Sequence, residues 1–358
     1  GTDTSVNFIG TRDNKPLLFK INNKKAGLIS VDNLGLGHRS LEQLEYGGNN
    51  FNNHTAIGNA ALTNLRNGIL NLGLGTYGLG LLQNGSSNVG IGFQSGSFAL
   101  GSDNVIIANA SNFSINEFDS ITDNIIIGNH TPTFNLVSDK NVLIGSNAGG
   151  NLISGGGNVA VGDSASASNS TGVSNVAIGA KALAFNTTKS NLVAIGDSAL
   201  YNNGIGATIT DAIENTAIGS KALFANTTGS LNTAVGFQAL KNNQASAANA
   251  AFGTRALETN ISGSGNTALG YHALQLHQSN DYNTAIGANA LASDETGGAN
   301  VAVGVSTLAL NISGIGNNAL GNVALQNNRN GNHNTAFGDG TLTNNRSGNE
   351  NVALGFKA

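Results

Sequence analysis

The chain has 358 residues and an unusual composition, with fifty Gly, two Pro, no Cys, Met or Trp, and only 10% charged residues. Ordinary domains carry about 25% charged residues and less Gly, so this composition excludes a large aromatic core. Sixteen basic against twenty acidic residues give a net charge of −4 without a basic stripe, which argues against nucleic acid or an anionic membrane surface as a partner, and the lack of Cys excludes disulfides and thiol chemistry.

Residues 1–32 differ from the rest of the chain. They hold five of the sixteen basic residues, Arg12, Lys15, Lys20, Lys24 and Lys25. We predict that this segment is an N-terminal cap or a junction to a preceding domain. No apolar run reaches the roughly 20 residues that span a bilayer, so direct membrane insertion is not expected.

Residues 33–358 repeat one short unit. From residue 215 onward the copies read NTAIGSKAL, NTAVGFQAL, NAAFGTRAL, NTALGYHAL and so on to NVALGFKA. The same register runs back to Gly37 and gives nineteen copies, with Ala108 in place of one glycine. Fourteen of the eighteen intervals are 17 residues long. A fixed period of this length is typical of a solenoid, in which each repeat packs on its neighbours.

Alternation along a strand assigns the positions of each repeat to two faces. The residue before the glycine is apolar in every copy, from Leu36 to Leu354, and we predict that it points into the core. The residue two before the glycine is Ala in most copies, and we predict that this small, flat row packs against another chain about a rotation axis. The interface candidates are Ala217, Ala234, Ala251, Ala268, Ala285 and Ala302.

Two further rows complete the predicted coil. Asn lies four residues before the glycine in seventeen copies, with His54 and Leu192 as the exceptions, and stacked amides predict a ladder at a structural corner. Leu lies four residues after the glycine in most copies and forms a second inward row. The remaining Asn, Ser, Thr and Gly favour turns. The predicted fold is an all-β parallel β-solenoid, or β-roll, of about nineteen coils with two short strands in each.

Irregular coils lie near residues 108–128 and 201–213. They or their neighbours carry the aromatic residues Phe113, Phe118, Phe134 and Tyr201. Exposed aromatic residues on the loops of a rigid scaffold are a usual recognition device, so these four are the ligand-binding candidates. The alternative is that the same loops fold over a coil end or an oligomer contact.

Catalytic and metal-binding patterns are few. His272 and His277 lie five residues apart near Asp281, and we expect surface histidines there rather than a metal site. The G-x-G strings are copies of the repeat with Gly in place of Ala, without the helix and acidic residue of a nucleotide loop. IGSKAL fits the hexapeptide unit of β-helical acyltransferases, but that fold needs three such units per coil. We therefore expect no enzyme activity, cofactor or metal.

The motif N-[TV]-A-[IVLF]-G-x-x-[AS] resembles the head repeats of YadA-like trimeric autotransporter adhesins. It is also similar to longer-period repeats of Bacteroidota surface proteins and of phage-like tail fibres. The resemblance covers the chain from Asn33 to Phe356. It implies a left-handed parallel β-roll in which three chains pack around an axis, exposure on the cell surface, and binding to host matrix or other surfaces.

These observations favour a secreted or cell-surface homo-oligomer, a trimer or a larger cyclic ring, that acts as a fibre or adhesin. It would present a rigid rod for attachment to a host or prey cell through a cell-surface, glycan or matrix ligand. The alternative is a structural segment of a phage-like or injection-system tail fibre. A hexapeptide-type acyltransferase is the third hypothesis.

Overall fold

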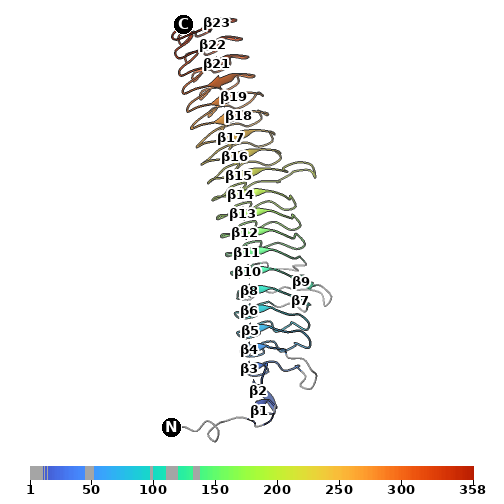
Figure 1. Cartoon of the computed structure of the whole chain (residues 1–358). Helices are drawn as coiled ribbons and strands as arrows, with labels where there is room; N and C mark the ends of the chain where they lie inside the picture. Colours follow the sequence, from blue (N-terminus) through green and yellow to red (C-terminus); the bar gives the residue numbers. More distant parts are fainter. Residues whose placement is uncertain are drawn as a thin grey trace, which may run out of the picture. The chain divides into compact units, whose positions relative to one another are not determined.

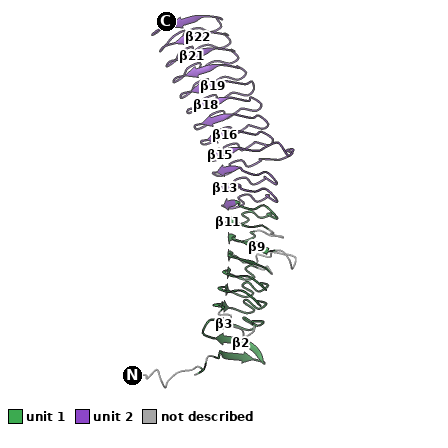
Figure 2. Cartoon of the chain, turned by 45° about the vertical axis from the view of Figure 1, so that its right-hand side comes forward, with its two compact units in different colours: residues 1–158 green, residues 159–358 purple. Residues whose placement is uncertain are grey.

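The structure is a computed structural model that describes residues 11, 13, 15–44, 52–96, 100–109, 120–131 and 138–358. The described residues form strands and turns and contain no helix (Figure 1). The chain divides into two compact units, residues 1–158 and 159–358 (Figure 2). Within each unit short strands follow one another in chain order as the rungs of a stack, which confirms the parallel β-solenoid with its spacing of about 17 residues.

In unit 1, residues 1–158, the part that the structure describes contains the first eleven strands. β3 to β6, β8 and β10 to β11 pair in parallel, one strand per coil. β2 instead pairs antiparallel with both β1 and β3, so the β1–β2 hairpin lies against the first rung. The strands are β1 (Leu17–Ile21), β2 (Lys24–Ile29), β3 (Leu34–Leu36), β4 (Thr55–Ile57), β5 (Leu72–Leu74), β6 (Val89–Ile91), β7 (Leu100–Ser102), β8 (Val105–Ile107), β9 (Ser120–Thr122), β10 (Ile125–Ile127) and β11 (Val142–Ile144).

Unit 2, residues 159–358, is the more regular. Its twelve strands all have three residues and pair in parallel, and the alanine at the centre of one strand lies opposite that of the next, as Ala217 does opposite Ala234. The strands are β12 (Val159–Val161), β13 (Val176–Ile178), β14 (Val193–Ile195), β15 (Thr216–Ile218), β16 (Thr233–Val235), β17 (Ala250–Phe252), β18 (Thr267–Leu269), β19 (Thr284–Ile286), β20 (Val301–Val303), β21 (Asn318–Leu320), β22 (Thr335–Phe337) and β23 (Val352–Leu354).

The two faces of each strand are the reverse of the sequence-based prediction. The central alanines point inward, and all six interface candidates, Ala217, Ala234, Ala251, Ala268, Ala285 and Ala302, are fully buried inside the chain's own coils. The apolar residue before the glycine points outward instead, and Leu269 and Leu320 are 48% and 47% exposed. Since the alanines present no surface, a second chain cannot contact them.

Space inside the coil explains this reversal. The predicted second row is buried, as Leu62 and Leu79 show. A Cβ added to Gly90 would lie 2.5 Å from Cγ of Leu79, so here the leucine of one coil leaves room only for glycine in the strand of the next. Where the strand residue is large, as at Leu143, the second row is small, and a Cβ on Gly149 would meet Leu143 Cδ2 at 2.8 Å. Close packing therefore matches large to small across the interior.

Among the described residues, the second strand that was predicted for every coil is present in only part of unit 1, where β7 pairs with β9. In unit 2 the residues after the glycine form turns, and many hold a left-handed backbone, including His272 (φ 56°) and Leu274 (φ 51°). This conformation is uncommon for residues other than Gly. It is stabilised here by bonds between coils, because the amide of Leu274 donates to the carbonyl of Ala290 at 3.0 Å.

Candidate functional site: an outward apolar face and two buried polar columns

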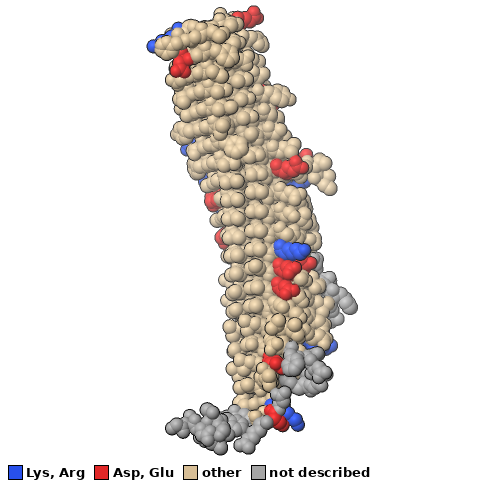
Figure 3. All heavy atoms as spheres, in the orientation of Figure 1, with Lys and Arg blue, Asp and Glu red and all other residues tan. Residues whose placement is uncertain are grey.

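Unit 2 presents an uninterrupted uncharged surface along its strands. We define the outward face as the first and third residues of β12 to β23. None of these twenty-four residues is charged, and the third residue of every strand is Val, Ile, Leu or Phe. Phe252 and Phe337 on this face are 40% and 42% exposed. On the side of the molecule drawn in Figure 3, most of unit 2 is free of charged side chains.

Neighbouring residues widen the outward face. Val303, Leu320 and Phe337 help to line a shallow, mainly apolar groove on it. Phe237 and Tyr271, which follow the repeat glycine in their coils, are 44% and 54% exposed. Contiguous apolar patches of this kind mark interaction sites on soluble proteins.

Of the four aromatic ligand-binding candidates, Phe113, Phe118 and Phe134 lie outside the described residues. Tyr201 is half-buried and belongs to a stack from three successive coils. Its ring lies edge-on to Phe185, with centroids 4.9 Å apart, and parallel to Phe224 at 5.0 Å. Because the faces of Tyr201 and Phe224 pack on each other, the stack stabilises the coil that carries the 201–213 insertion.

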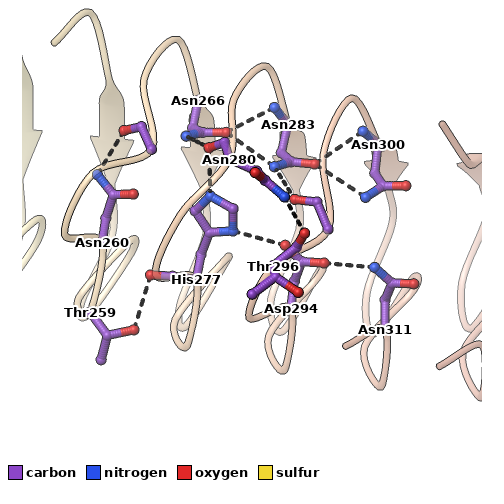
Figure 4. A network of polar contacts seen from close by, with 12 residues as sticks. Thr259, Asn260, Asn266, His277, Asn280, Asn283, Asp294, Thr296, Asn300 and Asn311 are labelled. Atoms are coloured by element: carbon purple, nitrogen blue, oxygen red, sulfur yellow. Dashed lines mark hydrogen bonds and ion pairs between the residues drawn. The ribbon is translucent and has the colours of Figure 1, made fainter. Parts of the chain in front are cut away.

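The predicted asparagine ladder is present as a first polar column. The side-chain oxygen of Asn283 accepts both the backbone and the side-chain N–H of Asn300, at 3.0 and 3.2 Å. Its amide nitrogen donates to the carbonyl of Gly297 at 2.9 Å and to the side-chain oxygen of Asn266 at 3.2 Å. The same pattern recurs along both units, so each buried amide satisfies a backbone group at the corner of its coil (Figure 4).

Sequence reasoning missed a second polar column, seven residues after the repeat glycine. It is buried from Asn169 to Asn328 in unit 2, and members are joined by side-chain bonds, as from Asn243 to Asn226 at 3.0 Å. The signal that could have revealed it is the recurrence of Asn at this one offset. The column is Asn169, Asn186, Asn203, Asn226, Asn243, Asn260, His277, Asp294, Asn311, Asn328 and Asn345.

The two titratable members of the second column face each other. Nδ1 of His277 lies 2.8 Å from Oδ2 of Asp294, and both side chains are fully buried. Nε2 of His277 lies 3.0 Å from the carbonyl oxygen of Asn280, and Asn311 donates to Oδ1 of Asp294 at 2.6 Å (Figure 4). The expectation of a surface position for His277 was therefore wrong, because its place in the column directs the ring inward.

His54 occupies an asparagine position of the first column in unit 1. It is 1% exposed, and its Nδ1 accepts a hydrogen bond from the backbone N–H of Asn71 at 3.2 Å, so that nitrogen carries no proton. Burial lowers the pKa of His54 to about 4, and the backbone of Gly68 opposes this shift in part. The ring is consequently neutral at physiological pH.

We predict that His54 makes unit 1 sensitive to acid. Its folded pKa lies below its unfolded value of about 6.5, so the unfolded chain binds more protons between these values. Stability is full above about pH 6.5 and declines toward pH 4, by at most about 3 kcal/mol. His54→Asn should remove this slope, measured by hydrogen exchange of residues 52–96 at pH 4.5 and pH 7. Equal slopes in both proteins would contradict the prediction.

The described residues contain no group of three or more His, Cys, Asp or Glu side chains placed to hold a metal ion. No helix suited to crossing a bilayer occurs in the part of the chain that the structure covers. Searches of protein-family models, of curated proteins and of solved structures find no match for the chain.

Proposed function

We propose that the protein is a homo-oligomeric extracellular fibre or adhesin whose chains associate through the outward face of unit 2. The observation that carries the proposal is the row of exposed or half-buried Val, Ile, Leu and Phe side chains in twelve successive strands without one charge. The occupant is further copies of the same chain, in a trimer by preference, because the repeat resembles that of the YadA-like trimeric adhesins. The proposed interface is therefore formed by the residues before the repeat glycine, and no longer by the buried alanines.

The size of the outward face supports this assignment. Twelve rungs at about 4.8 Å by three residues at about 3.3 Å project to about 550 Å². The row that follows the repeat glycine is not counted, because it contains the exposed residues Asp163, Asp197 and Asp339 beside Phe237 and Tyr271. Two such faces bury about 1,100 Å² in total, above the roughly 1,000 Å² that a biological interface needs, so the outward face alone is large enough for self-association.

A matched pair of leucines tests self-association. Leu320 lies on the outward face and is 47% exposed, whereas Leu310 lies in a turn of the preceding coil and is 41% exposed. Leu320→Glu should produce monomers, because it places charges in an apolar interface, and Leu310→Glu should leave the assembly intact. Light scattering coupled to size-exclusion chromatography measures both masses. A wild-type monomer, or equal behaviour of the two variants, would overturn the proposed interface.

The adhesin part of the proposal has a separate test. Several identical chains held together bind a surface with higher avidity than a single chain does. The assembled protein should therefore bind immobilised matrix protein or glycan more strongly than the Leu320→Glu monomer does. If the assembled protein bound none of these surfaces, the adhesin function would be rejected and a purely structural fibre would be the remaining proposal.

A further inference from the structure

We propose that the buried His277–Asp294 pair is a pH-sensitive latch that holds the coils of β18 to β20 together below neutral pH and weakens their stacking as the pH rises. The other nine members of the second column are Asn, which does not titrate. Only these two neighbouring positions carry ionisable groups, and each is fully buried.

Hydrogen-bond geometry fixes the number of protons on the pair. Both ring nitrogens of His277 face acceptors, the Asp294 carboxylate at 2.8 Å and the Asn280 carbonyl at 3.0 Å. The ring must donate at Nε2, and one further proton lies between Nδ1 and Oδ2 of Asp294. Whichever of these two atoms carries it, the pair as a whole is neutral and fully bonded. Loss of this shared proton leaves a net negative charge in the interior, which is strongly unfavourable.

Few other charges reach the pair. The charged side chains on the turns packed around it are Asp281 and Glu295, and both are exposed. Arg255 and Glu258 form an ion pair on the coil that precedes His277. Glu258 also accepts a hydrogen bond from the side chain of Gln275. Burial raises the pKa of Asp294, while the hydrogen bond and charge of His277 and the bonds from Asn311 and Gly297 oppose the rise. A raised carboxyl pKa means that the folded pair retains its shared proton more firmly than a free aspartate would.

The sign of the pH effect follows from proton counting. Above about pH 6.5 the unfolded histidine loses its proton, while the folded pair keeps the shared one. The folded state then binds one proton more, so stability falls as pH rises, by up to tenfold in the folding equilibrium per pH unit. Because each repeat of a solenoid contacts only its neighbours, opening at this position also separates the coils that follow.

Three variants of the full chain test the latch. The double variant His277→Asn/Asp294→Asn completes the asparagine column. In this variant the backbone amides should no longer lose protection from hydrogen exchange as the pH rises. Asp294→Asn alone leaves the buried imidazole without its carboxylate, and burial then disfavours the charged ring, so the stability of this variant should rise with pH through about 6.5, opposite to the wild type. His333→Asn replaces an exposed histidine of the same unit and should behave as the wild type does.

Hydrogen exchange of residues 266–310, measured from pH 6 to pH 9 and corrected for intrinsic exchange, reads out the opening of these coils. We expect the opening equilibrium of the wild type, relative to the double variant, to increase at least tenfold over this range. The latch would be overturned if the ratio of the two opening equilibria stayed constant with pH. It would also be overturned if stability changed with pH in the same direction in Asp294→Asn and in the wild type. The self-association of the outward face does not enter this comparison.

Discussion

Gly270→Ala should disrupt the stacking of β18 on β19. Gly270 has φ +145°, a backbone conformation that L side chains rarely adopt, and an added Cβ would lie 2.5 Å from the carbonyl oxygen of Gly287 and 2.6 Å from its carbonyl carbon. These are backbone atoms of the next coil, so neither moves without breaking the ladder. Strain at the residue and overpacking each cost about 1–3 kcal/mol, so we expect a loss of about 3–5 kcal/mol in urea unfolding.

Gly355 provides the matched control for this prediction. It occupies the same repeat position with φ +120°, but nothing lies within 4 Å of an added Cβ. Gly355→Ala therefore keeps the backbone strain and lacks the clash, and it should cost about 1–3 kcal/mol. Equal losses in the two variants would show that the close approach of successive glycines does not limit the stack.

The sequence predicted the coils and misassigned their faces for a definite reason. Alternation places Ala268 and Leu269 on opposite sides of β18, but it does not say which side is inside. Larger apolar residues are usually the buried ones, which favoured Leu269. The deciding fact is three-dimensional: the buried leucines of the turn, such as Leu257 and Leu274, fill the interior of these coils and leave room only for alanine in the strand.

The two polar columns also show which features the sequence alone can predict and which it cannot. The first column was predictable because Asn lies at one fixed offset from the glycine in seventeen copies. The second column has the same kind of signal in unit 2, yet His277 and Asp294 interrupt it, and a turn region rich in Asn hides the remaining members. Their partnership required the structure, because seventeen residues separate them and only the stacking of coils brings the side chains to 2.8 Å.

Asn283→Ala should be among the most destabilising substitutions in the first column. It removes the acceptor of the buried Asn300 N–H and the donor to the buried Gly297 carbonyl. Each unsatisfied buried group costs about 1–3 kcal/mol, so a loss of about 3–4 kcal/mol in urea unfolding is expected. Asn327→Ala is the control, because its side-chain bond to Asn344 is exposed, and it should change stability by less than about 0.5 kcal/mol.

Asn283→Asp separates the loss of hydrogen bonds from the loss of volume. The carboxylate has almost the shape of the amide but only accepts, so it would face the Gly297 carbonyl and the side-chain oxygen of Asn266, both of which now accept from Asn283. Burial and these acceptors raise its folded pKa, so the variant should be more stable in acid and lose stability as the pH rises through that pKa. If Asn283→Asp were as stable as the wild type at pH 7, the amide ladder would not be what holds the corner of the coil.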